Sequence, residues 1–370
     1  MTAPNSDEAP LLEVAGLTVT LRTPRGPAAA VRGLDFTLRR GEKLGIVGES
    51  GCGKSMTALA LMGLLPDGAR IEGRIALEGQ DLAHAPEAAL CRIRGNRIGM
   101  IFQEPMTSLN PLHRIGRQVA EPLRLHRGMD AGAARARAVA LLDRVGIPDA
   151  RRRADAYPHE LSGGQRQRVM IALALACDPA VLIADEPTTA LDVTIQGQIL
   201  DLIEELVAER GMALVLISHD LGVIGEVVDK VMVMYGGMAV ERGPVDAVFD
   251  RLTHPYAQGL FAALPQLGRD IAGRAGPHAR LQTIPGRVPE LADMPAGCPF
   301  TPRCPIAEDR CATVPPPVVA LDGSAVTAGS GHEAVCHRVP RALEGVFGRP
   351  PVGSDGDLDR RGAPAGGGPA

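Results

Sequence analysis

Apolar residues in the first part of the chain alternate with polar or small ones, as they do in β-strands. Between residues 11 and 36, Val14, Leu17 and Val19 are spaced in this way, and Thr23–Pro27 supplies a turn. A period near two places successive side chains on opposite faces of a strand, so that one face can be buried. This part of the chain is therefore predicted to form a β-region.

Later apolar segments are continuous rather than alternating. Four short runs are typical of strands buried on both faces: Lys43–Val47, Ala180–Ala184, Ala213–Ser218 and Lys230–Tyr235. Helices are predicted at Met56–Leu65 and Thr194–Arg210, and residues 116–178 are rich in helix formers, with helical spacing in Ala131–Val145. This alternation of strands and helices predicts an α/β fold with a parallel sheet that is covered on both faces.

The composition of the chain changes near Leu252, where Pro, Gly and Cys become frequent and periodicity weakens. We therefore expect a disordered leader over residues 1–10 and a main domain over residues 11–250. A small appended domain is expected over residues 251–338, followed by a disordered tail over residues 339–370.

The most specific motif of the chain follows the predicted strand at Lys43–Val47. Its members fit the pattern G-x-x-x-x-G-K-S/T at every fixed position: Gly48, Glu49, Ser50, Gly51, Cys52, Gly53, Lys54 and Ser55. Glycines let backbone N–H groups turn toward phosphate oxygens, and the helix that follows adds positive potential. Lys54 can reach the β- and γ-phosphates of a nucleotide, and the Ser55 hydroxyl can bind Mg²⁺. The predicted nucleotide site comprises these residues and Met56. A chance glycine-rich turn is the alternative, which the strand–loop–helix context disfavours.

Two acidic residues, Asp185 and Glu186, follow the apolar run that begins at Ala180. In a parallel sheet, a carboxylate at the carboxyl end of a strand lies beside the phosphate loop. Asp185 is therefore predicted to hold the magnesium shell, whereas Glu186 points elsewhere and could polarise the attacking water. A solvated acidic turn is the plain alternative for this pair.

Five motifs follow one another along the chain: Gly48–Ser55, Gln103, Leu161–Gln165 (LSGGQ), Asp185–Glu186 and His219. In this order they closely resemble the motifs of the ABC ATPase family, and the resemblance spans about residues 11–250. Residues 189–192 stand where the dimer-contacting loop of that family stands. LSGGQ is the most specific element, since ordinary phosphate-loop enzymes lack it.

The resemblance implies a P-loop ABC ATPase core with an antiparallel β-subdomain and a helical subdomain at about residues 105–178. It implies ATP and Mg²⁺ as ligands, with the metal near Ser55, Gln103 and Asp185. Three residues would be catalytic in this family: Glu186, His219 and Gln103. His219 would sense the γ-phosphate, and Gln103 would contact magnesium and water and relay to a membrane subunit.

In the dimer of that family, LSGGQ lies across the γ-phosphate of the ATP bound by the partner. Four residues would thus serve a nucleotide held mostly by another subunit: Ser162, Gly163, Gly164 and Gln165. Plainer interpretations are a helix cap for Ser162, a structural role for His219 and an exposed loop amide for Gln103. The chain departs from the family where an aromatic residue commonly stacks on adenine, because the matching position is Leu21.

Four further segments resemble the dipeptide/oligopeptide importer ATPases: Phe102–Pro111, His254–Tyr256, Ile284–Pro289 and Cys298–Pro305. They extend the resemblance to His337. It implies two membrane permeases, an external solute-binding protein and a second ATPase subunit, either a copy or a paralogue. The chain would energise the uptake of di- or oligopeptides, with nickel or glutathione import as the alternative within the same branch.

Four cysteines are gathered in the last part of the chain: Cys298, Cys304, Cys311 and Cys336. In a cytosolic chain such a group points to metal more than to disulfides. Four thiolates suit tetrahedral zinc or a 4Fe–4S cluster, and the spacing alone does not decide between these and unligated thiols. The importer branch carries an iron–sulfur cluster at this place, so the resemblance favours a structural cluster. The other cysteines, Cys52, Cys91 and Cys177, are interpreted as loop and core residues.

Composition bears on location and on partners. No apolar run approaches the roughly 18 residues of a membrane-spanning helix, and the N-terminus lacks the features of a signal peptide. We therefore expect a peripheral protein on the cytoplasmic side of the inner (plasma) membrane, docked on other subunits. The net charge of −4 argues against nucleic-acid binding, and Arg151–Arg153 is interpreted as a solvated helix face. A soluble ABC ATPase of DNA repair or translation is the rival, which the importer-type C-terminal motifs disfavour.

Overall fold

The N-terminal part of the chain forms a four-stranded antiparallel sheet. The computed structural model describes residues 9–104, 108–188, 192–263, 283–321, 331–343 and 346. The strand order is β2-β1-β4-β5, and the strands are β1 (Leu12–Thr23), β2 (Gly26–Leu38), β4 (Arg70–Leu77) and β5 (Gln80–Asp81). In β1 the alternating residues Leu12, Val14, Leu17 and Val19 are buried, which confirms the predicted β-region.

A second sheet of eight strands forms the centre of the molecule, in the order β11-β12-β10-β9-β3-β8-β7-β6. Its strands are β3 (Lys43–Val47), β6 (Ile98–Ile101), β7 (Val181–Asp185), β8 (Ala213–Ser218), β9 (Lys230–Tyr235), β10 (Met238–Pro244), β11 (Val318–Ala320) and β12 (Glu333–Val335). Neighbours from β9 to β6 run parallel, whereas β10, β12 and β11 are added in antiparallel fashion. Every residue of β7 and β8 is buried, as expected for strands covered on both faces. The predicted α/β fold is confirmed.

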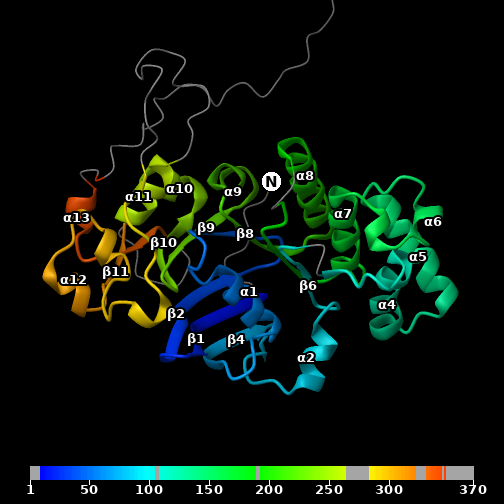
Figure 1. Cartoon of the computed structure of the whole chain (residues 1–370), viewed down its shortest axis with the longest axis horizontal. Coiled ribbons are helices and arrows are strands. Elements are labelled where there is room, and N and C mark those ends of the chain that lie inside the picture. Colours follow the sequence, from blue (N-terminus) through cyan, green and yellow to red (C-terminus); the bar gives the residue numbers. More distant parts are fainter. Residues whose placement is uncertain are drawn as a thin grey trace, which may run out of the picture.

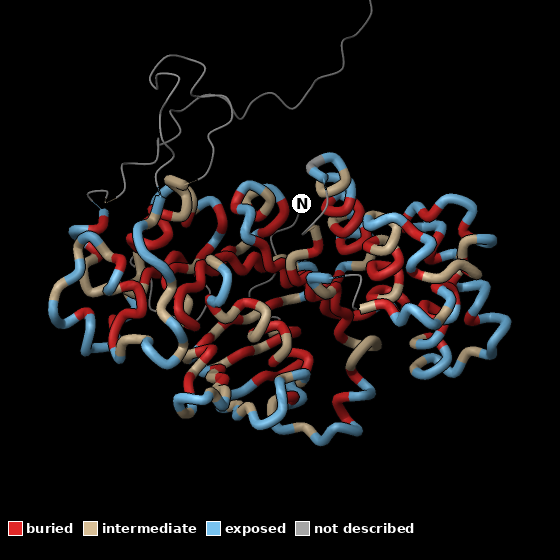
Figure 2. Tube along the Cα trace, in the orientation of Figure 1, coloured by how far each residue is buried: buried red, intermediate tan, exposed pale blue. Residues whose placement is uncertain are grey.

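Two layers cover this sheet (Figure 1). The four-stranded sheet and α1 (Lys54–Met62) lie on one side, and four helices lie on the other: α8 (Val193–Arg210), α9 (Leu221–Val227), α10 (Val245–Asp250) and α11 (Pro255–Ala262). Buried residues concentrate where these layers meet (Figure 2). The helix predicted to reach Leu65 ends earlier, because Gly63 adopts a left-handed φ of 62° and caps the last turn.

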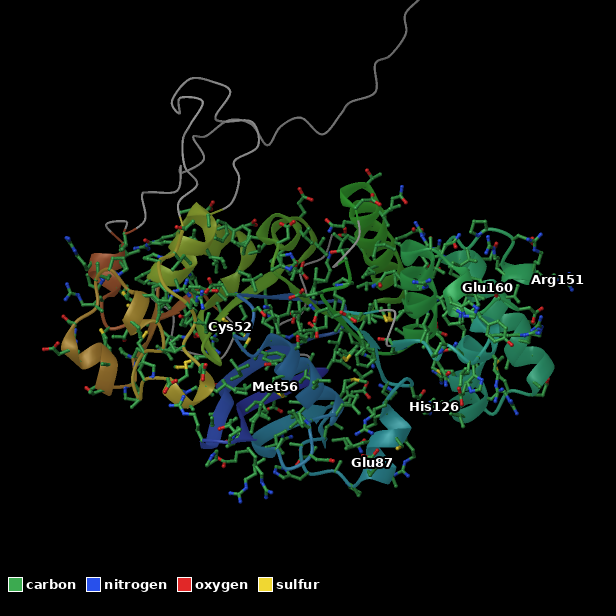
Figure 3. All side chains as sticks on the ribbon, viewed as in Figure 1. Cys52, Met56, Glu87, His126, Arg151 and Glu160 are labelled. Carbon is green, nitrogen blue, oxygen red and sulfur yellow. The ribbon has the colours of Figure 1, made fainter. Side chains whose placement is uncertain are left out.

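A group of helices forms one end of the molecule (Figure 1). Its elements are α4 (Ile115–Arg127), α5 (Ala131–Arg144), α6 (Ala150–Arg153), the 3-10 turn η1 (Pro158–Glu160) and α7 (Gly163–Ala174), and α2 (Glu87–Ile93) precedes them. The Asp130 side chain caps α5 by accepting from the N–H groups of Gly132 and Ala133. Arg151 is exposed at the outer edge of this group, in keeping with a solvated helix face (Figure 3).

The C-terminal part of the chain is built onto the edge of the main sheet, because β12 pairs with β10. It also contains η3 (Leu291–Asp293), η4 (Thr301–Arg303), α12 (Asp309–Thr313) and α13 (Val339–Ala342). Glu241 of β10 is fully buried and accepts from the backbone N–H groups of Thr253 and His254 at 2.9 and 2.7 Å. Its carboxylate also bonds the ring of His332 at 2.8 Å. This part therefore extends the central sheet.

The first residues of the predicted disordered tail are helical. α13 occupies its first residues and is held by the side chain of Gln258, whose Nε2 donates to the carbonyl of Ala342 at 2.8 Å. The N–H of Val346 donates to the amide oxygen of the same side chain at 2.9 Å. The rest of the predicted tail and residues 1–8 of the predicted leader lie outside the described residues. Within the described ranges, no helix combines the length and apolar character that a membrane crossing requires.

Candidate nucleotide site

The backbone of the phosphate loop explains its glycines. Gly48 has a φ of 154° and Gly53 a φ of 96°, both in regions that glycine adopts most readily. A Cβ on Gly48 would lie 2.3 Å from the carbonyl oxygen of Met234, and one on Gly53 would lie 2.5 Å from that of Ala30. Any larger residue would displace neighbouring backbone, so glycine alone allows the loop to curl at these two positions.

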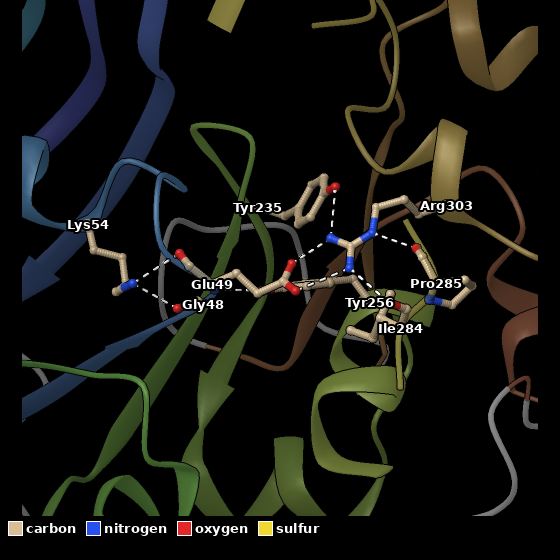
Figure 4. A network of polar contacts seen from close by, with 8 residues as sticks. All are labelled: Gly48, Glu49, Lys54, Tyr235, Tyr256, Ile284, Pro285 and Arg303. Carbon is tan, nitrogen blue, oxygen red and sulfur yellow. Dashed lines mark hydrogen bonds and ion pairs between the residues drawn. The ribbon is translucent and has the colours of Figure 1, made fainter. Parts of the chain in front are cut away.

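Lys54 begins α1, and its side chain reaches back into the curled loop. The Nζ atom donates to the carbonyl oxygens of Gly48 at 2.7 Å and Glu49 at 3.1 Å (Figure 4). The side chain is only 5% exposed. A buried ammonium group at the N-terminus of a helix adds its charge to the helix dipole, which suits this place for a phosphate. Ser50, Gly51 and Cys52 complete the loop, and Met56 lies in the first turn of α1.

A hydroxyl and a carboxylate meet beside the loop in the arrangement predicted for magnesium. The Ser55 hydroxyl donates to Oδ1 of Asp185 at 3.1 Å, and Asp185 ends β7 and is buried. Burial raises the pKa of Asp185, the nearby Glu186 acts in the same direction, and the Ser55 hydrogen bond opposes both. Oxygen ligands of this kind are those that Mg²⁺ prefers.

Glu186 lies where the other predicted catalytic residues converge. It has a left-handed φ of 46°, and its N–H donates to the carbonyl of Ile217 at 3.0 Å, which turns the side chain out of the β7 line. Oε2 accepts from Gln103 Nε2 at 3.0 Å and lies 3.4 Å from Nδ1 of His219, while Oε1 lies 3.9 Å from Lys54 Nζ. The His219 side chain is 67% exposed, so the site opens to solvent on that side.

The LSGGQ residues are placed apart from this group. Ser162 caps α7 by accepting from the N–H of Gln165, and the Gln165 side chain accepts from the N–H of Ser162, so the two form a capping box. Gly163 and Gly164 make the first turn of α7, which lies toward the helical end of the molecule (Figure 1). The plainer interpretation of Ser162 as a helix cap is therefore confirmed, which does not conflict with a role in a dimer.

Two sequence assignments concern the borders of the site. Asp192 caps α8 by accepting from the N–H of Ile195 at 3.0 Å, while residues 189–191 of the predicted dimer-contacting loop lie outside the described residues. Leu21, the counterpart of the adenine-stacking aromatic, is partly buried in β1 and lines a surface cavity of about 290 Å³. An apolar side chain at this position offers contact without ring stacking.

Sequence reasoning missed two residues, Tyr256 and Arg303, that reach the phosphate loop from the C-terminal half. Tyr256 OH accepts from the N–H of Glu49 at 2.8 Å, and the Arg303 guanidinium pairs with the Glu49 carboxylate and with Tyr235 OH (Figure 4). Tyr256 and Arg303 lie in segments singled out only for their resemblance to importers. Their partner is separated from Arg303 by 254 positions, so no local pattern could have revealed the contact.

The four C-terminal cysteines line one small cavity of about 20 Å³. Burial raises the pKa of Cys298 to about 12 and that of Cys304 to about 11, and the neighbouring thiols Cys336 and Cys311 act in the same direction. In the part of the chain that the structure describes, no three His, Cys, Asp or Glu side chains are placed to hold a single metal ion. The remaining cysteines lie elsewhere, with Cys52 and Cys177 buried and Cys91 exposed.

A phosphate-binding loop, a hydroxyl–carboxylate pair and a second carboxylate beside a histidine define the class of phosphate-loop nucleotide hydrolases. Residues 31–189 match the family described as ABC transporter, and residues 240–311 match the family described as oligopeptide/dipeptide transporter, C-terminal region. A Brucella melitensis protein named as a peptide import ATP-binding protein is 52% identical over 320 residues, or 85% of this chain and 94% of that protein. One from Brucella suis is 52% identical over 316 residues, with 85% and 93% covered.

Solved structures agree with these relatives. The dimeric post-hydrolysis structure of the ATP-binding cassette MJ0796 with ADP and Pi is 29% identical, with a TM-score of 0.57, covering 63% of this chain and 98% of that one. CbiO1 from Clostridium perfringens, part of the ABC transporter complex cbiONQ, is 29% identical, with a TM-score of 0.55 and 65% and 91% covered. The chain therefore belongs to the ABC transporter family, as one of its ATPase subunits.

Proposed function

We propose that this chain hydrolyses ATP to energise the uptake of di- and oligopeptides through partner permeases. The observation that carries the proposal is the coexistence of two features in one chain. One is the group formed by Lys54, Ser55, Asp185 and Glu186, and the other is the match of residues 240–311 to the oligopeptide/dipeptide transporter C-terminal region. The names of the Brucella relatives support peptides as the substrate class.

Roles within the site follow from the distances. Lys54 and the N–H groups of the phosphate loop would bind the β- and γ-phosphates, and Ser55, Asp185 and Gln103 would hold Mg²⁺. When bound, Mg²⁺ neutralises charge that develops on the phosphates. Glu186 would orient the attacking water and accept its proton, because its carboxylate is turned out of the strand and lies beside Lys54 and His219 at the mouth of the phosphate loop.

Two neighbours would assist Glu186. Gln103 donates to its carboxylate at 3.0 Å, and His219 approaches the same oxygen within 3.4 Å. We infer that His219 contacts the γ-phosphate when nucleotide is bound and that Gln103 relays the state of the site toward a membrane subunit. Both residues lie at the open side of the group, where phosphate and solvent would enter.

Each nucleotide site would be completed by a second ATPase subunit, a copy or a paralogue. Ser162–Gln165 forms a glycine-rich helix entrance, which is suited to an anion, yet lies apart from the phosphate loop of its own chain. The related cassette MJ0796 has been solved as a dimer. We infer that ATP joins two such subunits and that hydrolysis releases them, so that differential affinity for nucleotide drives the permeases between two states.

The region after residue 250 would carry a 4Fe–4S cluster on Cys298, Cys304, Cys311 and Cys336. The four thiols share one buried cavity, which supports a common ligand. Four cysteine thiolates are the ligand set that a 4Fe–4S cluster takes in proteins. The cluster would fix the fold of a segment that has little apolar core of its own.

We further infer an ATPase domain over about residues 11–250, with the helical subdomain at about residues 105–178, and an importer-type region over residues 251–338. The two family matches support this division. The chain would sit as a peripheral subunit on the cytoplasmic side of the inner membrane, bound to two permeases that receive peptide from an external binding protein. No nucleic-acid partner is proposed.

Affinity purification from detergent-solubilised membranes tests this function. A tagged chain is expected to recover integral membrane permeases, identified by mass spectrometry, in amounts comparable to its own. Lys54→Ala, which removes the phosphate-binding ammonium, should retain the permeases but lose ATP hydrolysis. Recovery of no membrane protein, together with turnover that DNA or ribosomes stimulate, would contradict the proposal.

A further inference from the structure

Glu49, the first variable residue of the phosphate loop, is held by all three of its polar groups (Figure 4). Its N–H donates to Tyr256 OH at 2.8 Å, and its carbonyl accepts from Lys54 Nζ at 3.1 Å. Its carboxylate accepts from both terminal nitrogens of Arg303, at 2.5 and 3.1 Å. Glu49 is therefore bonded to Lys54 of the phosphate loop on one side and to Tyr256 and Arg303 of the C-terminal half on the other.

The guanidinium of Arg303 uses all of its N–H groups in hydrogen bonds within the protein. Besides the two Glu49 oxygens, its N–H groups donate to Tyr235 OH at 3.2 Å and to the carbonyls of Pro285 at 2.9 Å and Ile284 at 3.3 Å. These five acceptors equal the five N–H donors of a guanidinium. The side chain is 4% exposed. A bidentate pair with a buried guanidinium is more rigid than an ion pair between two exposed side chains.

An aromatic cluster keeps the pair in place. Phe300 packs edge-on against Tyr235, with ring centroids 5.1 Å apart, and lies 5.4 Å from the ring of Tyr256. The Arg303 guanidinium lies over the rings of Tyr235 and Phe300 at 5.7 and 5.9 Å. All three rings are fully buried in a chain that has only three tyrosines and six phenylalanines. These scarce aromatic residues therefore pack against one another and around the Arg303 guanidinium.

A second contact joins the same two parts. The N–H of Gly237, in the turn between β9 and β10, donates to the carbonyl of Cys52 in the phosphate loop at 3.1 Å. Its neighbour Gly236 lies so close to the C-terminal segment that an added Cβ would be 2.5 Å from Cβ of Pro299. The turn is therefore packed between the loop and the segment that carries Arg303.

We propose that Arg303 is a positioning residue for ATP binding, which acts by holding Glu49 so that the phosphate loop stays in its binding conformation. This inference deepens the proposed function and rests on it. A loop that is already ordered loses little conformational entropy when phosphate binds, so its affinity is higher than that of a loop held from one side only. Arg303, in the C-terminal half of the chain, would thereby raise the affinity of the site for nucleotide without contacting the nucleotide.

The test uses the full chain with Arg303→Met, Glu49→Gln and both together, and it measures equilibrium binding of Mg²⁺-ADP and of a non-hydrolysable ATP analogue. Each single change should raise Kd about tenfold, a size usual for coupled sites. KM for ATP should rise in parallel, and in Arg303→Met kcat at saturating ATP should stay at the wild-type value, because Arg303 does not meet the reacting atoms. The double variant should be no weaker than the weaker single variant, since the two residues act as one unit.

Arg25→Met is the matched control. Arg25 bonds Asp293 with nitrogen–oxygen distances of 2.8 and 2.5 Å, so it also links the C-terminal segment to the N-terminal half, but it is half exposed and lies in the β1–β2 turn. The Arg25→Met variant should bind both nucleotides with the same Kd as the wild-type chain.

The possible results separate a failure of this proposal from a failure of the proposed function. Wild-type Kd in Glu49→Gln would overturn the proposal, whether or not Arg303→Met folds, because this change leaves the C-terminal segment intact. A lower melting temperature in either variant without a change in Kd would show a purely structural contact and would also overturn it. A wild-type chain that binds neither nucleotide would instead contradict the proposed function.

Discussion

At the scale of single residues, the proposed role of Asp185 in holding Mg²⁺ predicts a dependence on pH. Burial raises the pKa of this carboxyl above its ordinary value of 3.8, and only the carboxylate form can hold Mg²⁺. We therefore predict that Mg²⁺-dependent ATP binding weakens as the pH falls, beginning at a higher pH than for an exposed aspartate. Calorimetric titrations over a series of pH values check this.

Asp185→Asn supplies the control, because ATP itself also titrates. The variant should bind Mg²⁺-ATP weakly at every pH. The difference in affinity between wild type and variant at each pH then reports the titration of Asp185 alone. Since the folded-state pKa is raised, protonation of Asp185 favours the folded form, so the affinity should fall while the protein remains folded. Equal pH profiles for the two proteins would contradict the assignment of Asp185 to the metal.

Residues of the site were predictable where their signals are local. The motif Gly48–Ser55 needs only a strand, a loop and a helix in succession, and the structure has all three. The contacts between Gln103, Glu186 and His219 follow from parallel strands that end at one edge of the sheet. The Glu49–Arg303 pair could not be foreseen, because it depends on how a segment 254 positions away folds back.

At the scale of elements, Glu241 joins β10 to the C-terminal part of the chain. It is fully buried, and its carboxylate accepts hydrogen bonds from two backbone N–H groups and bonds the ring of His332. Glu241→Ala leaves these donors unpaired, so we predict a loss of about 3 kcal/mol in the free energy of unfolding, measured by urea denaturation. Glu72→Ala, on an exposed position of β4, should change it by less than about 0.5 kcal/mol. Equal stabilities of the two variants would count against this role.

Strands were predicted more closely than chain ends. The runs Ala213–Ser218 and Lys230–Tyr235 coincide with β8 and β9, because continuous apolar sequence leaves few alternatives to a buried strand. The C-terminal boundary was wrong, since α13 has little apolar periodicity and is held by the side chain of Gln258. Likewise β12 is too short to be recognised without its neighbour β10.

At the scale of the whole molecule, the proposed cluster on the four C-terminal thiols predicts a coloured protein that contains iron. Protein purified without oxygen should be brown, absorb visible light and contain about four irons per chain. Cys304→Ser and Cys336→Ser should lose iron, whereas Cys91→Ser, on the exposed face of α2, should keep it. A colourless, iron-free protein that remains folded would refute the cluster.

In the proposed dimer, the chain would contribute to two ATP sites, with its phosphate loop to one and with Ser162–Gln165 to the other. The phosphate loop and its acids lie at the centre, while Ser162–Gln165 lies toward the helical end (Figure 1). Closure of two subunits would bring complementary halves together, and an opening step after hydrolysis would separate them. The proposed mechanism therefore predicts that transport requires turnover and not nucleotide binding alone.

Peptide uptake by cells that carry Glu186→Gln in place of the wild-type chain tests this requirement most directly. Loss of the carboxylate should leave Mg²⁺-ATP binding near normal and slow hydrolysis by at least about 100-fold, the usual contribution of a general base. We predict that cells lacking the chain fail to take up a labelled oligopeptide, that the wild-type chain restores uptake, and that Glu186→Gln does not. Uptake by Glu186→Gln cells at the wild-type rate would contradict ATP-driven import by this protein.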